Sequence, residues 1–266
     1  MHEEWEATRA TLHAYSHAVS ALPRAHAVAH PKWWHVSLAI TPAGLVTDAM
    51  QLPGGGAARV RMDLSRHVAA IETSQGDVLE FDLTAGMTGT ELGDALIAAA
   101  ADLGLEDVYD RERFESDEPR PYDPGAAETW FGAVTDVAGV FRRHIASLAG
   151  WSGPVQHWPH NFDTSVEWFA DRMVSHTEGG ETTESPAQIN LGFYPAGRPY
   201  FYSNPWPFDA DALVGIPLPH GAEWHTEGWE GTILYYDTLA GDPSGPEKLA
   251  EYAAAVHAAA APTLAG

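Results

Sequence analysis

Apolar and polar positions follow two different periods along the chain. Between residues 3 and 22, apolar or small residues recur at steps of three or four: Trp5, Thr8, Leu12, Tyr15, Val19 and Leu22. This spacing predicts an amphipathic helix, and Pro23 is expected to end it. The same period predicts helices over 88–103, 126–148 and 246–260.

Period-two alternation predicts the strands. It runs through Trp34–Ile40, where it would place Trp33 and Trp34 on opposite faces of one strand. Other strand-like segments are 45–52, 58–64, 67–73, 78–83, 153–158, 164–173, 187–194, 199–203 and 230–237. Antiparallel strands flanked by helices indicate the α+β class, not βαβ winding.

Two stretches of the chain are alike in pattern. Val78–Gly86 and Ile233–Gly241 match, and each leads into an Ala-rich helix. The match predicts two similar α+β halves, residues 1–105 and 126–266, and indicates an internal duplication. The segment 106–125 between them is acidic and contains prolines, which is typical of a solvated connector.

Charge and composition narrow the possible partners. The chain has 37 acidic against 14 basic residues, a formal net charge of −23. Such a surface repels phosphate backbones and anionic lipids, so nucleic-acid and membrane partners are not expected. No apolar run approaches the ~20 residues of a membrane span and the N-terminus does not resemble a signal peptide, which predicts a cytoplasmic protein.

The chain contains no cysteine and ten tryptophans. The first fact excludes disulfides, iron–sulfur clusters, thiolate metal sites and cysteine nucleophiles, and it leaves any other cofactor unknown. The second suggests aromatic cores or pockets, because each Trp buries a large area.

Many short motifs occur in one order along the chain. They include Lys32–Leu38, Thr41–Thr47, Met62–His67, Ser152–Val155, Gly192–Pro195 and Phe201–Ser203. Read together, they resemble an uncharacterised bacterial family known as domain of unknown function 5996, from Trp5 to the last helix. No activity is established for that family, so the resemblance implies none.

The segment 151–172 contains the most site-like residues. His157, His160 and Asp163 have the donor types of a metal site, but on a strand His160 would point away from the other two. A metal site is therefore not favoured over a hydrogen-bonded cluster. Asp163 and Arg172 coincide with family motif positions, which suggests a core ion pair or an Arg that binds an anionic ligand group.

Asp63 and His67 form a second polar pair across a probable bend. An Asp that orients a neutral His is a general-base arrangement, and a hydrogen bond that stabilises a hairpin is the favoured alternative.

Aromatic residues suggest a ligand-binding wall that includes Trp34, Trp158 and Tyr202. The segment Trp224–Glu230 combines aromatic rings and carboxylates, which would suit a cation or a sugar. The resulting hypothesis is a small-molecule-binding protein with its site in a cleft between the halves, or an enzyme there without a bound redox cofactor. The alternative is a non-catalytic interaction module that uses exposed aromatic residues.

Overall fold

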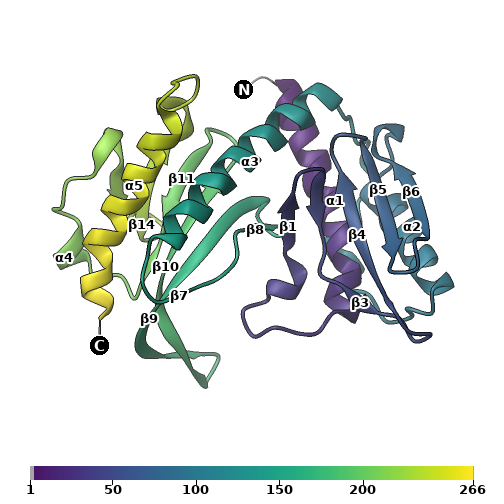
Figure 1. Ribbon diagram of the computed structural model, residues 1–266, viewed down its shortest axis with the longest axis horizontal. Coiled ribbons are helices and arrows are strands. Elements are labelled where there is room, and N and C mark those ends of the chain that lie inside the picture. The colour runs from purple at the N-terminus through teal and green to yellow at the C-terminus, as the bar shows by residue number, and fades with distance from the viewer. Residues whose placement is uncertain (1–2, 266) are drawn as a thin grey trace. The chain divides into compact units, whose positions relative to one another are not determined.

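A computed structural model describes residues 3–265 (Figure 1). The chain divides into two compact units. Unit 1 runs to Thr135 and includes Gln156–Asp163, whereas unit 2 consists of Asp136–Val155 and the described residues from Thr164 onward. The predicted connector, 106–125, lies wholly inside unit 1.

Unit 1 is built on an antiparallel sheet. Its strands are β1 (Leu38–Thr41), β2 (Gly44–Val46), β3 (Met50–Gln51), β4 (Ala57–Asp63), β5 (Val68–Thr73), β6 (Val78–Asp82) and β8 (Gln156–Trp158). They pair in the order β8-β1-β2-β4-β5-β6, with β3 also on β4. The predicted α+β class with antiparallel sheets is confirmed.

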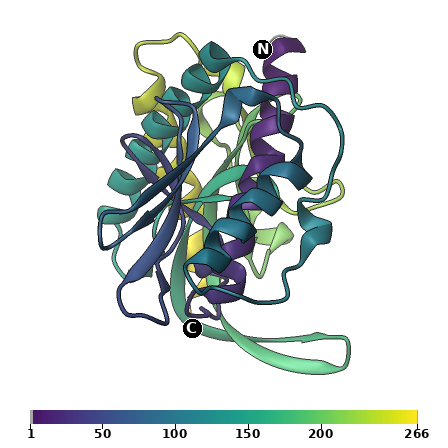
Figure 2. The ribbon, with the colours of Figure 1, turned by 90° about the vertical axis from the view of Figure 1, so that its right-hand side faces the viewer.

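Two helices cover one face of this sheet, α1 (Glu3–His26) and α2 (Gly89–Asp102), which lie side by side in Figure 2. α2 begins with a capping box, in which Thr88 Oγ1 accepts from Glu91 N at 3.1 Å and Glu91 accepts from Thr88 N at 2.8 Å. α1 does not end at Pro23 as predicted. One missing N–H in the last turn is tolerated, and the Pro23 carbonyl still accepts from Ala27 N.

The strand expected over Trp34–Ile40 is wrong in its first half. Trp33 takes a left-handed conformation (φ 59°), and a 3₁₀ turn, η1, covers Trp34–Val36 before β1 begins at Leu38. The left-handed residue breaks the alternation, because a strand needs extended dihedrals throughout.

The acidic connector is anchored to the helices of unit 1. It contains a short 3₁₀ helix, η3 (Arg111–Arg113), followed by Phe114, which is only 2% exposed. A Cβ on Gly93 of α2 would lie 2.3 Å from the Phe114 ring, so this glycine makes room for the aromatic side chain. Thr11 Oγ1 also donates to Pro121 O at 2.7 Å.

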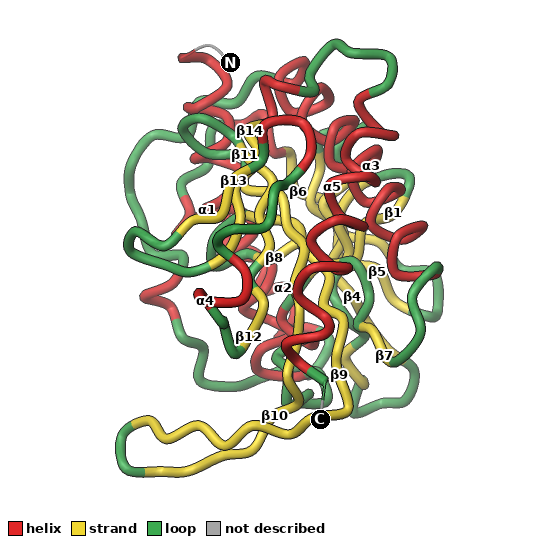
Figure 3. Tube along the Cα trace, turned by 90° about the vertical axis from the view of Figure 1, so that its left-hand side faces the viewer, coloured by secondary structure: helices red, strands yellow, loops and turns green. Residues whose placement is uncertain are grey.

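Unit 2 has a second antiparallel arrangement. Its strands are β7 (Trp151–Ser152), β9 (Asp163–Glu178, from the unit boundary), β10 (Glu181–Tyr194), β11 (Tyr200–Ser203), β12 (Pro205–Trp206), β13 (Glu223–His225) and β14 (Gly231–Tyr235). The order is β13-β14-β11-β10-β9, with β12 on β10 and β7 on β9. The β9–β10 hairpin extends well past the other strands of this unit (Figure 3).

The two faces of the unit 2 sheet differ in composition. On the helix face, Trp168 pairs with Ile189, Val166 with Leu191, and Phe193 with Phe201. This face packs under α5 (Gly245–Ala260) and the end of α3 (Pro124–Ala146). The opposite side, which we call the aromatic face, presents Tyr194, Tyr200 and Tyr202, because side chains alternate along a strand.

The two matching stretches fold alike locally. β6 leads into a 3₁₀ helix, η2 (Leu83–Ala85), and Gly86 at φ 73°; β14 leads into η5 (Tyr236–Thr238) and Gly241 at φ 78°. Their surroundings differ, since β6 lies at the end of the strand order whereas β14 lies between β13 and β11. The internal duplication stays a prediction.

Two short helical segments complete unit 2, α4 (Ala210–Leu213) and η4 (Pro219–Gly221), and η6 (Ala261–Leu264) extends α5. Across residues 3–265, no helix combines the length and the apolar character needed to cross a membrane.

Candidate functional site

The histidines of the 151–172 segment are packed among aromatic rings. His157 is completely buried, with its ring 5.4 Å from Trp130 and 4.7 Å from Phe162, both edge-on. Burial lowers the pKa of His157 to about 3. His160 contacts Trp158 edge-on at 5.7 Å. Within the described part of the chain, no three His, Asp or Glu side chains are arranged to hold a metal ion.

Asp163 and Arg172 do not form the expected ion pair. Both lie on β9, where nine extended residues separate two Cα atoms by about 30 Å. Asp163 is buried, while Arg172 Nη1 donates to the Thr263 carbonyl at 3.3 Å, after the end of α5. The spacing of nine looked short in sequence, but it is long because the chain between the two residues is extended.

Asp63 does not orient His67 either. Asp63 caps the β4–β5 turn, where it accepts from Ser65 Oγ at 2.7 Å and from Arg66 N at 3.0 Å, and it pairs with Arg61. Burial alone would raise the pKa of Asp63, but these bonds hold it below its usual value. Asp63 therefore stabilises the hairpin turn through Ser65, Arg66 and Arg61, and not through the pairing with His67 that the sequence suggested.

His67 instead has two partners from the connector and α3. Its Nδ1 lies 3.0 Å from the Tyr122 hydroxyl, and its Nε2 lies 3.3 Å from Glu128 Oε1. Burial raises the pKa of Tyr122, so its hydroxyl stays protonated and can donate to Nδ1. These contacts fasten the end of the connector to the β4–β5 turn.

The three predicted aromatic wall residues lie in different surroundings. Trp34 stacks on His30, with 4.3 Å between ring centroids, and is half-buried. Trp158 ends β8 in unit 1. Tyr202 belongs to the aromatic face of unit 2, where it lies within a larger aromatic group.

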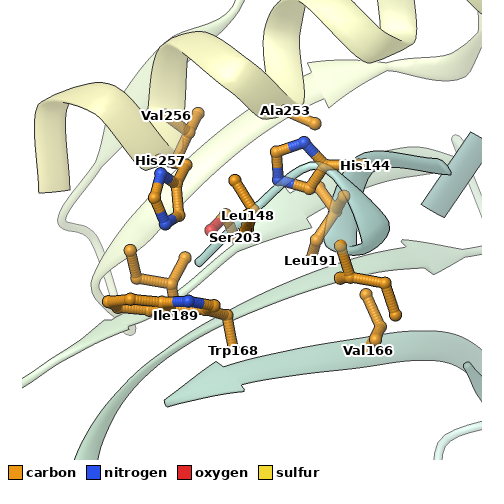
Figure 4. A pocket seen from close by; sticks show the side chains of 11 residues that line it. His144, Leu148, Val166, Trp168, Ile189, Leu191, Ser203, Ala253, Val256 and His257 are labelled. Atoms are coloured by element: carbon orange, nitrogen blue, oxygen red, sulfur yellow. The ribbon is translucent and has the colours of Figure 1, made fainter. Parts of the chain in front are cut away.

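Two histidines that sequence reasoning missed line a cavity on the helix face. Figure 4 shows His144 of α3 and His257 of α5 above Trp168, Ile189 and Leu191. The ring centroids of the two histidines are 6.1 Å apart, and His257 meets Trp168 edge-on at 4.8 Å.

This cavity is small and apolar. Its volume is about 10 Å³, close to the minimum for one water molecule and far below a ligand pocket. Burial lowers the pKa of His144 to about 4, with a smaller contribution from His257, and burial lowers the pKa of His257 too. Both histidines are therefore neutral packing residues at neutral pH.

A shallow depression in unit 1 is larger, at about 290 Å³. It is lined mainly by Ala57, Ala58, Thr73 and the Arg59–Glu72 pair, whose charged atoms are 2.9 Å apart. Its two charges neutralise each other, so no charged group is directed at a ligand.

The aromatic face holds a cluster of rings that we call the aromatic platform, formed by Tyr194, Tyr200, Tyr202 and Trp229. The centroid of the Tyr200 ring lies 5.4 Å from that of Tyr194, 6.2 Å from that of Tyr202 and 6.4 Å from that of Trp229. All four side chains are partly exposed. His225 packs against Trp229 at 4.5 Å and extends the platform toward β13.

Glycines give two of these rings room to pack closely on the sheet. Gly192 pairs directly with Tyr202, and a Cβ on Gly192 would lie 2.1 Å from Cζ of that ring. A Cβ on Gly231 would lie 2.7 Å from the Trp229 ring. A side chain at either position would displace the ring, so the two glycines allow this packing.

The surroundings of the platform are acidic. Glu223 shares its cross-strand row with Ile233 and Tyr202. Glu227 and Glu230 flank Trp229 in sequence, and segment 223–230 contains no Lys or Arg. Aromatic faces beside carboxylates can bind polar small molecules through ring contacts and cations through electrostatic attraction.

These features define an antiparallel α+β protein with a small histidine-lined cavity on one side of a sheet and an aromatic platform on the other. The chain belongs to the Family of unknown function (DUF5996), whose family model matches residues 1–265. No curated protein and no solved structure matches it.

Proposed function

We propose that this protein binds a small molecule on the aromatic platform of unit 2. The observation that supports the proposal is the close packing of Tyr202 against Gly192 and of Trp229 against Gly231. This packing fixes two rings before any ligand arrives, so little side-chain entropy is lost on binding.

The cavity described on the helix face is too small to be the binding site. Its volume of about 10 Å³ admits at most a water molecule. The platform is instead built from three partly exposed rings on the adjacent strands β10 and β11 and from Trp229 in the loop before β14, with His225 and Glu223 at its edge. The cleft expected between the halves, any catalytic activity and the cytoplasmic location stay predictions.

A thermal-shift screen with neutral sugars, organic cations and aromatic acids tests the proposal, because any ligand of the native state raises the unfolding midpoint. Each compound that raises the midpoint is then titrated against Tyr202→Ala and Trp229→Ala. Trp151→Ala is the matched control, since Trp151 is an exposed tryptophan of the same unit that stacks on Phe169, outside the platform.

The proposal expects binding to fall at least about tenfold in the two platform variants, since each ring contact contributes about 0.5–2 kcal/mol and truncation also frees its neighbours. Binding in Trp151→Ala is expected to stay at the wild-type level. The proposal would be contradicted if no compound raised the midpoint. It would also be contradicted if Tyr202→Ala and Trp229→Ala bound the active compounds as tightly as the wild type does.

A second candidate, the interaction module, is favoured by two exposed tryptophans. Trp33 is 58% and Trp151 52% exposed, although large aromatic side chains usually bury most of their surface. Self-association measured by sedimentation velocity over a concentration series tests this candidate. A sedimentation coefficient that rises with concentration in wild type but not in Trp33→Ser or Trp151→Ser would support it.

A further inference from the structure

The structure also points to the chemical class of the ligand, an inference that rests on the proposed function. We infer that the aromatic platform prefers a small organic cation, such as an alkylammonium group, to a neutral or anionic molecule.

Unit 2 already holds one cation over an aromatic ring. The Arg198 guanidinium lies over the Tyr235 ring, with Cζ 3.6 Å from the ring centroid. Asp237 fixes it with two bonds, of 2.9 Å to Nε and 3.0 Å to Nη2. Tyr235 pairs with Tyr200 across β14 and β11, so this stacked cation lies beside the platform, on the same face.

The charged groups beside the remaining rings are carboxylates. Glu223 lies in the same cross-strand row as Tyr202 and is exposed. Exposed Glu227 and Glu230 flank Trp229. Arg198 is already paired with Asp237, and β9, β10, β11, β13 and β14 contribute no other Arg or Lys to this face in the part of the chain that is described.

The orientations of the rings also suit a cation. A cation interacts favourably within about 6 Å of an aromatic centroid, best over the ring face. Tyr200 and Trp229 are nearly parallel (18°), whereas Tyr202 and Trp229 meet at 81°. An alkylammonium group on this surface can therefore contact differently oriented rings at once, while the carboxylates balance its charge.

The electrostatic field of the whole protein also favours cations over anions. A net charge of −23 raises the local concentration of cations and lowers that of anions near the surface. This effect alone gives no specificity, so the inference depends on the platform and its adjacent carboxylates.

The test compares tetramethylammonium with tert-butanol, an uncharged molecule of similar shape. Both are titrated into full-length protein and followed by amide NMR spectra, in wild type and in Tyr202→Ala. The expected result is a dissociation constant at least about fivefold lower for tetramethylammonium, which corresponds to one cation–π contact of about 1 kcal/mol. Tyr202→Ala is expected to abolish this difference.

A charge variant gives an independent readout. Glu223→Gln is expected to weaken tetramethylammonium binding about twofold or more and to leave tert-butanol binding unchanged, since a nearby carboxylate acts on charge alone. Glu247→Gln is the matched control, because Glu247 is an exposed carboxylate in the first turn of α5. Added salt should weaken the binding of tetramethylammonium and leave the binding of tert-butanol unchanged.

The possible outcomes separate the two claims. If tert-butanol or a neutral sugar binds in a Tyr202-dependent manner as tightly as the cation, the preference for cations is overturned while small-molecule binding at the platform stands. If no probe produces Tyr202-dependent shifts, both claims fail. If Glu223→Gln and Glu247→Gln weaken the cation equally, the attraction is non-specific and the inference is overturned.

Discussion

The two faces of the unit 2 sheet use aromatic and titratable side chains in different ways. On the helix face, the partly buried His144 and His257 pack with Trp168 around a cavity of about 10 Å³. On the aromatic face, Tyr200, Tyr202 and Trp229 rest on the strands and stay partly exposed. The same residue types therefore stabilise the core on one side and remain available to a ligand on the other.

β11 shows this difference within four residues. Tyr200 and Tyr202 are partly exposed, whereas Phe201 and Ser203 are buried. Burial thus decides function here more than residue type does, because an aromatic ring that is sealed by helices cannot meet a ligand.

The largest expected effect is a difference in unfolding free energy between substitutions at two adjacent positions of β11. Phe201→Ala should lower the free energy of unfolding by about 3–5 kcal/mol, because it leaves a cavity beneath the helices. Tyr202→Ala should cost no more than about 2 kcal/mol, since its ring is only partly buried. Urea denaturation of the two variants measures the difference, and equal losses would contradict the assignment of the two faces.

Gly192→Ala should have the next largest effect. Its new Cβ would lie 2.1 Å from the Tyr202 ring, which must move away. We expect a loss of about 1–3 kcal/mol in unfolding free energy, together with loss of ligand binding. Gly132→Ala is the control, because nothing lies within 4 Å of its Cβ on α3; it should stabilise the helix by about 0.5–1 kcal/mol.

The sealed histidines predict a pH dependence that belongs to the helix face. The folded-state pKa of His144 is about 4, below the usual value of about 6.5. The unfolded chain therefore binds more protons between these values, so stability is fully present above pH 6.5 and is lost as the pH falls toward 4.

After allowance for solvent screening, His144 should contribute about 1–2 kcal/mol to this loss. His144→Gln should reduce the slope of unfolding free energy against pH, while Tyr202→Ala should keep the wild-type slope. An unchanged slope in His144→Gln would show that the cavity is open to water.

The smallest expected effect concerns Arg198. Arg198→Gln removes the guanidinium from Tyr235 and leaves another ring for an external cation. Tetramethylammonium binding should rise about two- to threefold, because an exposed cation–π contact is weak. Unchanged or weaker binding would indicate that Tyr235 does not extend the platform.

Local pattern was sufficient to predict most of the elements. The helix over 88–103 and the hairpin of β5 and β6 were predicted correctly, because the residues that form the cap at Thr88 are close together in sequence, as are those that form the turn after Thr73. The strand expected over Trp34–Ile40 failed at Trp33, since a left-handed residue leaves no mark on hydrophobic alternation.

Long-range partners were not predictable. His67 bonds Tyr122 and Glu128, and Asp63 bonds its own turn, although the four-residue spacing suggested a pair. His144 and His257 come from distant helices, so no local motif connects them. The platform was partly foreseeable from Tyr202 and from Trp224–Glu230, but its assembly depends on the β11–β14 pairing.

The most direct test of the central claim is an amide NMR titration of the wild-type protein with tetramethylammonium. We predict chemical-shift changes at Gly192, Tyr202 and Ile233, with none at Ala253 and Val256 beneath the sealed face. Shifts centred on α5, or spread evenly over the acidic surface, would contradict the assignment of the aromatic platform as the binding site.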